Sequence, residues 1–163
     1  MKETNVGLAE CAISRSPDDV LVAYGLGSCV GVVMVDPVTK LCGLLHAVLP
    51  RAGDGMDQAE FNPYKYVESG IENLIASLKI QGANPAKLIV RIVGGANMLM
   101  RSNLTQSFDI GTRNIEAAVT TLSRLKMPIT VSEVGGHTGR TVRVYVADRR
   151  VTVRVVGEKE HEI

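Results

Sequence analysis

The sequence predicts an α+β fold, a layered α/β sandwich of mainly antiparallel strands with two principal helices. The predicted elements run as several strands, a helix, a strand, a helix and three strands, which is not the regular alternation of a doubly wound parallel sheet. The chain has 163 residues, 45% of them hydrophobic, which is enough for the core of one domain spanning residues 1–163.

Short apolar runs predict four strands in the first fifty residues. The last two form a hairpin that turns at Asp36 and Pro37, a pair typical of tight turns. The polar, glycine-containing residues 51–62 then predict a surface loop that could border a site. The four apolar runs are residues 5–13, 20–24, 29–36 and 41–50.

Helical periodicity predicts two helices separated by a strand. Asn62 and Pro63 suit an N-cap and a first helical position, and the helix runs until Gly82. Residues 87–95 are typical of a buried strand, and Pro128 ends the second helix. The periodic apolar residues are Val67, Ile71, Leu74, Ile75 and Leu78 in the first helix, and Ile115, Ala118, Val119 and Leu122 in the second.

The last third of the chain predicts three more strands and a tail. The strands are residues 129–134, 140–148 and 151–156. Valines alternate with polar residues in the last two, which predicts a hairpin with one face in solvent. The charged residues 158–163 predict a weakly structured tail in which His161 is solvated.

Composition excludes several classes of partner. Lys and Arg number 18 against 17 Asp and Glu, and aromatic residues are 4%, so we expect no nucleic acid and no anionic membrane as a partner. No segment approaches the roughly 20 apolar residues that span a bilayer, so we expect no membrane insertion and a cytoplasmic protein. Three cysteines without a CxxC pair fit a reducing compartment.

Cys29 follows a Gly-Leu-Gly-Ser turn and precedes an apolar run, so it could be core packing, a metal ligand or a nucleophile. Gly25, Gly27 and Gly31 miss the GxGxxG fingerprint by one residue and no helix follows, which disfavours nucleotide binding. A cysteine among apolar residues is most often a small buried hydrophobe. A glycine turn, however, can leave a side chain lightly covered and lets backbone N–H groups face an oxyanion.

The predicted hairpin supplies Cys29 with a partner. If Asp36 lies opposite Thr39, Cys29 lies directly opposite His46. Opposed Cβ atoms are about 4.5–5.5 Å apart, so a thiol and an imidazole can share a hydrogen bond. Cys42 lies four residues before His46 on one strand, roughly 13 Å away. A one-residue bulge would break the predicted pairing.

Residues 25–50, GLGSCVGVVMVDPVTKLCGLLHAVLP, resemble the signature of the chemoreceptor glutamine deamidase family, CheD, in their LGSCV and HxxLP segments. The similarity continues in GGANML at 94–99, IGTRNIEA at 110–117 and GGHTGRTV at 135–142. The resemblance implies a sandwich related to bacterial toxin deamidases. It also implies a hydrolase that converts glutamines of methyl-accepting chemotaxis receptors to glutamate.

On the matching positions, the resemblance makes Cys29 the nucleophile and His46 the base, acting through a thioester without a cofactor or a metal. Members of the family in some lineages also bind a CheC-type phosphatase, which is a possible partner here. The family usually has threonine six positions before the cysteine as a third catalytic residue, where this chain has Ala23. Alanine cannot orient an imidazole, so a substitute is needed or catalysis is slow. The polar candidates nearby are Tyr24, Ser28 and Thr39.

Three other interpretations remain open. A zinc site could combine two cysteines with two histidines, although the paired ligand spacing typical of zinc is missing; its ligands would be Cys29, Cys42, His46 and His137. A different cysteine hydrolase, such as a protease or a transglutaminase, would use the same pair. A non-enzymatic adaptor would keep the fold around a site weakened by Ala23. We interpret His137 as a loop residue, and Arg113 and Asn114 as surface or capping residues rather than catalytic ones. The resemblance to the family motif allows a structural role for Arg113 and Asn114 near the site.

Overall fold

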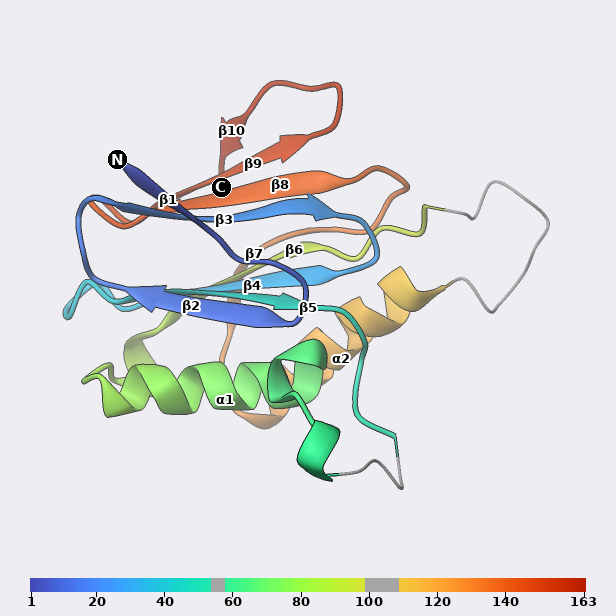
Figure 1. Cartoon of the computed structure of the whole chain (residues 1–163), viewed down its shortest axis with the longest axis horizontal. Coiled ribbons are helices and arrows are strands. Elements are labelled where there is room, and N and C mark those ends of the chain that lie inside the picture. The colour runs from blue at the N-terminus through green and yellow to red at the C-terminus, as the bar shows by residue number, and fades with distance from the viewer. Residues whose placement is uncertain (54–57, 99–108) are drawn as a thin grey trace.

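The computed structural model describes residues 1–53, 58–98 and 109–163. Its strands form two five-stranded sheets stacked face to face, and the helices cover the outer surface of one sheet (Figure 1). We call the sheet that lies between the helices and the other sheet the central sheet, and the sheet on the far side from the helices the outer sheet. Among the strands of the described residues, only β1 with β3 and β6 with β7 pair in parallel, so the predicted, mainly antiparallel α+β sandwich is confirmed.

The two sheets combine strands from both halves of the chain. The outer sheet contains, in spatial order, β1 (Lys2–Asn5), β3 (Asp19–Leu26), β8 (Arg140–Tyr145), β9 (Arg150–Val155) and β10 (His161–Glu162). The central sheet contains β2 (Glu10–Ser14), β5 (Cys42–Ala47), β4 (Val30–Val35), β6 (Ile89–Gly94) and β7 (Ile129–Val134). The helices are α1 (Val67–Ile80) and α2 (Ile110–Arg124), with 3₁₀ turns at Gln58–Glu60, Pro63–Lys65 and Pro85–Lys87.

Two hydrophobic cores hold the layers together, one on each face of the central sheet. Every residue of β4 and β5 is buried, because one set of alternating side chains faces the helices and the other faces the outer sheet. Burial on both faces explains why these strands are continuous apolar runs in the sequence. None of the helices in the described residues is both long and apolar enough to cross a membrane.

The N-terminal segment differs from its prediction. Residues 5–13 do not form one strand, because the chain turns at Gly7 and passes from the outer sheet to the central sheet. The Gly7 N–H donates to Glu10 Oε2 at 2.8 Å, and Ala9 has a positive φ of 61°. In Figure 1 this turn lies at the same end of the sandwich as the end of β5 and the start of α2.

Both helices are confirmed, with changes in their details. Asn62 caps the 3₁₀ turn at Pro63–Lys65, where its Oδ1 accepts the Tyr64 N–H at 3.0 Å, and α1 itself begins at Val67. In the second helix, Ala118 and Leu122 are buried and Ile115 packs at the edge of the core as predicted, but Val119 is 46% exposed. The buried residues of α2 are Gly111, Asn114, Ala117, Ala118, Thr121 and Leu122.

The small residues of α2 explain which side of the helix packs most closely on the core. A Cβ atom on Gly111 would collide with the carbonyl oxygens of Gly95 and Ala96, so the helix start lies directly against the segment that follows β6. The C-terminal tail also differs from its prediction, because β10 pairs with β9. His161 remains an exposed residue, although its Nε2 atom lies 2.9 Å from Glu133 Oε1.

Candidate active site

The register of the β4–β5 hairpin differs from the predicted one. His46 pairs with Gly31, and Val30 pairs with Ala47, so Cys29 does not lie directly opposite His46. Continuing this register would place Cys29 opposite Val48. The predicted two-residue turn between Asp36 and Thr39 is therefore wrong, and the correct pairing is displaced by two residues.

Asp36 causes this displacement, because its carboxylate organises a wider turn. The Asp36 Oδ1 atom accepts the N–H of Val38 at 2.8 Å, and Lys40 adopts a positive φ of 64°. The turn closes where the Asp36 N–H donates to the Leu41 carbonyl at 2.9 Å. Four residues rather than two therefore separate the paired positions.

A displacement of two residues leaves every side chain on its predicted face, because the side-chain period of a strand is two. Cys29 packs with Val33 and Leu44 in the core between the sheets. His46 follows Leu44 by two residues on β5, so its ring projects from the same face. Cys29 is thus a diagonal neighbour of His46, a separation that a long side chain can bridge.

The imidazole of His46 is fixed in one orientation and one tautomer. The ring is 3% exposed, and its Nδ1 atom lies 2.9 Å from the Val6 carbonyl oxygen. A carbonyl can only accept a hydrogen bond, so Nδ1 carries the proton and Nε2 presents a lone pair. Nε2 is buried and has no hydrogen-bond partner among the described residues. The arrangement leaves Nε2 able to accept a proton.

Burial sets the protonation states of both candidate residues. It lowers the pKa of His46, although the hydrogen bond to Val6 and the charge of Glu10 act in the opposite direction. Burial raises the pKa of the Cys29 thiol, an effect that the Cys29 N–H partly offsets. Both the Cys29 thiol and the His46 imidazole are therefore expected to be neutral at pH 7, which suits proton transfer during attack rather than a resting ion pair.

The glycine turn before Cys29 is held by the end of β6. The Ala96 N–H donates to the Gly27 carbonyl, and the Gly95 N–H donates to the Cys29 carbonyl, both at 2.8 Å. Gly94 has a φ of 105°, and a Cβ atom there would collide with the Cys29 carbonyl oxygen. The Cys29 N–H is oriented toward its own sulfur, where an oxyanion would form.

None of the polar side chains suggested as substitutes for the missing threonine hydrogen-bonds to His46. Ala23 is fully buried between the sheets, whereas the Tyr24 hydroxyl donates to Glu3 Oε2 at 2.7 Å. Thr39 belongs to the hairpin turn that Asp36 organises. The Val6 carbonyl instead orients the imidazole. Sequence reasoning missed it because a main-chain atom has no residue-type signature.

Asn114 lies near the candidate site, in the structural place that the family motif allowed, but not on the surface. It is fully buried rather than on the surface, and its side-chain amide donates to the carbonyls of Ser28 and Val48 at 2.8 and 2.9 Å. The sequence did contain an indication that Asn114 is buried. Asn114 follows Gly111 by three residues and precedes Ala118 by four, which is the spacing of residues on one face of a helix. Arg113, its neighbour, forms an ion pair with Asp109 at 3.0 Å.

The other cysteines and His137 lie in different surroundings. Cys42 pairs with Val35 at the opposite end of β5 from His46, and burial raises the pKa of Cys11 and of Cys42 to about 11. His137 is an exposed loop residue, as predicted, with Nδ1 2.9 Å from the Asn97 carbonyl oxygen. The described ranges contain no group of three or more His, Cys, Asp or Glu side chains that could hold a metal ion.

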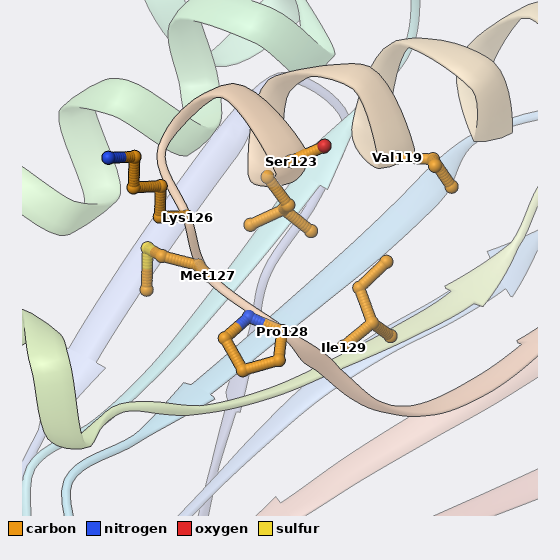
Figure 2. A pocket seen from close by; sticks show the side chains of 7 residues that line it. Val119, Ser123, Lys126, Met127, Pro128 and Ile129 are labelled. Atoms are coloured by element: carbon orange, nitrogen blue, oxygen red, sulfur yellow. The ribbon is translucent and has the colours of Figure 1, made fainter.

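A cavity of about 400 Å³ lies at the other end of α2 from Asn114. Figure 2 shows its side chains around the segment in which the helix ends and β7 begins. Lys126 is the ionisable side chain of this lining, and neither a thiol nor an imidazole belongs to it. The lining residues are Val119, Leu122, Ser123, Lys126, Met127, Pro128 and Ile129. This cavity therefore offers no chemistry comparable to that around Cys29.

Comparison with known proteins gives a consistent result. The family model described as CheD chemotactic sensory transduction matches residues 48–155. A probable chemoreceptor glutamine deamidase CheD of Symbiobacterium thermophilum is 40% identical over 97% of this chain and 95% of that protein. The corresponding protein of Caldanaerobacter subterraneus is 38% identical over 96% and 94%. The chemoreceptor glutamine deamidase CheD of Halalkalibacterium halodurans is 37% identical over 97% and 96%. The chain belongs to the CheD family.

Proposed function

We propose that this chain is a chemoreceptor glutamine deamidase in which Cys29 is the nucleophile and His46 the general base. The observation that carries the proposal is the state of the imidazole. Its Nδ1 atom is fixed by the Val6 carbonyl, and its buried Nε2 atom has no partner among the described residues. The names of the relatives support the substrate, since they are called chemoreceptor glutamine deamidases.

The first half-reaction forms a thioester. The Cys29 sulfur attacks the side-chain amide carbon of a receptor glutamine while His46 Nε2 accepts the thiol proton. The carbonyl oxygen becomes an oxyanion that the Cys29 N–H can stabilise. The C–N bond then breaks, and the imidazolium returns its proton to the departing ammonia.

The second half-reaction releases glutamate. His46 Nε2 accepts a proton from a water molecule, whose oxygen attacks the thioester carbon. The C–S bond breaks, the sulfur takes the proton back from the imidazolium, and the free thiol is recovered. Amide and water are thus converted to carboxylic acid and ammonia, so the residues of this chain need no cofactor or metal.

The proposal places the reaction in the cytoplasm, with methyl-accepting chemotaxis receptors as macromolecular substrates. A CheC-type phosphatase partner stays a prediction. Mass spectrometry of a receptor cytoplasmic domain incubated with the protein tests the activity, because each converted glutamine gains about 1 Da.

We expect the wild-type protein to produce that mass change, and Cys29→Ala and His46→Gln to produce none. Cys11→Ser is the matched control, because Cys11 is only partly buried on β2 and should retain wild-type turnover. A receptor domain whose mass never changes, or a Cys29→Ala protein that is fully active, would contradict the proposal.

A further inference from the structure

Three consecutive main-chain carbonyls around the candidate nucleophile are held by two different parts of the molecule. The Gly27 and Cys29 carbonyls accept backbone N–H groups from the segment after β6. The Ser28 carbonyl between them accepts the side-chain amide of Asn114, at 2.8 Å. The first two contacts attach the turn to β6. Only the Asn114 contact, among the three, connects the turn to another strand, because the same amide also reaches Val48.

The second acceptor of Asn114 lies just beyond His46. Val48 is two residues after His46, and the β4–β5 ladder ends one step earlier, at the pair of Val30 and Ala47. The amide therefore spans the position where the next rung would form, with Ser28 on one side and Val48 on the other. Its two N–H groups set the distance between the chain segments that carry the thiol and the imidazole.

The remaining atom of the Asn114 amide adds a cost to folding. Asn114 is fully buried, and its Oδ1 atom has no hydrogen-bond partner among the described residues. A buried acceptor without a partner costs free energy of folding. The other residues of this helix face are glycine, alanine, threonine and leucine, which carry no such cost.

We propose that Asn114 is a positioning residue, which holds the Cys29 turn against the end of β5 so that the Cys29 sulfur meets His46 Nε2. The inference rests on the proposed function. Asn114 itself does not touch the reacting atoms. Replacing it should separate the pair without removing either member.

Alkylation of Cys29 by iodoacetamide tests this role without a receptor. Peptide mass spectrometry reads the modification of Cys29 alone, with Cys11 in the same chain as an internal reference. In the wild-type protein we expect rapid alkylation near pH 7 that His46→Gln abolishes, because His46 accepts the thiol proton during attack. In Asn114→Leu, which has a similar shape but no N–H donors, we expect that His46-dependent rate to fall at least about tenfold.

Thr121→Val is the matched control. Thr121 lies two turns further along the same buried face of α2 and is 1% exposed, so the variant disturbs the helix packing without touching Ser28 or Val48. It should keep the wild-type alkylation profile. With a receptor domain as substrate, Asn114→Leu should lower kcat per folded molecule and change the shape of its pH profile, whereas a general loss of folded protein would scale kcat by one factor at every pH.

The outcomes separate the two proposals. Alkylation of wild-type Cys29 that does not depend on His46 overturns the proposed pair. A His46-dependent rate that Asn114→Leu leaves unchanged overturns the positioning role alone. If Asn114→Leu does not fold, Asn114→Ser retains one donor and should give an intermediate rate. Nuclear magnetic resonance of the wild-type protein adds an independent check, because rapid exchange of both Asn114 side-chain amide protons would also refute the role.

Discussion

The Val6 carbonyl oxygen lies 2.9 Å from His46 Nδ1 and joins the two sheets at the candidate active site. Val6 extends β1 of the outer sheet, because its N–H donates to the Val22 carbonyl of β3 at 2.7 Å. His46 belongs to β5 of the central sheet. A main-chain oxygen thus occupies the position of a third member that orients the base.

This contact predicts the effect of restoring the threonine that the family usually carries. Ala23→Thr should leave the deamidation rate unchanged, because Nδ1 already has its partner. The added atoms enter a closed core between the sheets, so the free energy of unfolding should fall by about 1–3 kcal/mol. Kinetics by mass spectrometry and thermal melting measure the two effects. A tenfold faster Ala23→Thr protein would show that the Val6 carbonyl does not orient the base.

Glu10 allows the charge around His46 to be changed without touching the reacting atoms. Glu10 pairs with His46 across β2 and β5, and its charge raises the pKa of His46. Glu10→Gln should therefore lower that pKa and move the acid limb of the kcat/KM profile to lower pH. Glu60→Gln, an exposed change outside β2, is the control and should leave the limb in place. A limb that moves to higher pH in Glu10→Gln would contradict the assignment.

The same histidine makes stability depend on pH. Burial lowers the folded pKa of His46 below the value of 6.5 expected in the unfolded chain. The unfolded state therefore binds more protons, and stability is complete above pH 6.5 and decreases as the pH falls toward the folded pKa. The slope approaches about 1.4 kcal/mol per pH unit.

Denaturant titrations from pH 5 to 7 measure this slope, and His46→Gln should flatten it. His161 acts in the opposite direction, because its hydrogen bond to Glu133 raises its pKa. The protein with His46 and the His46→Gln variant should therefore both carry His161→Gln as a common background. An equal slope with and without His46 would assign the effect to other groups.

The Gly111→Ala variant tests the close approach of α2 to the segment after β6. An alanine in an exposed helix position stabilises by about 1 kcal/mol relative to glycine. Gly111→Ala should instead destabilise by about 1–3 kcal/mol, because its Cβ meets two main-chain carbonyls that cannot move independently. It should also slow the alkylation of Cys29. Gly70→Ala is the control, since its Cβ would meet only the flexible Leu45 side chain and should spare Cys29.

Cys29 and Cys42 should respond to the same substitution in different ways. Cys29→Ala should abolish deamidation. Cys42→Ala should retain it and lose about 1 kcal/mol of stability, because the side chain is fully buried at the other end of β5. Turnover and melting temperature distinguish the two. An inactive, stable Cys42→Ala protein would place the chemistry elsewhere.

The sequence correctly predicted the elements in which the buried side chains are large and apolar. The valines of β8 and β9 alternate as expected and pack on the central sheet. The opposite face is only partly in solvent, since its β8 residues are half-buried and Thr152 is 4% exposed. Val119 was wrongly placed on the buried face of α2, because much of that face consists of small residues. Large residues such as Val119 gave the stronger periodic signal, although close packing of the helix required Gly111.

The site was predicted through its residue types and not through its geometry. The Asp36 side chain widened the hairpin turn in a way that the Asp-Pro pair does not reveal. The observed register still leaves Cys29 and His46 on the same face of the sheet, because the register error was an even number of residues. The Val6 contact depends on where a main-chain oxygen lies after the chain has crossed between sheets, and no local pattern encodes that position.

The bond between Val6 and His46 also makes the chemistry conditional on tertiary structure. The β4–β5 hairpin alone contains both Cys29 and His46, so a partly folded chain with only the central sheet would already bring thiol and imidazole near each other. Without the outer sheet, however, the imidazole would exchange between tautomers and rotate freely. In the proposed mechanism the proton acceptor is therefore complete only when the two sheets are packed together, so the activity should depend on the whole sandwich rather than on the hairpin region alone.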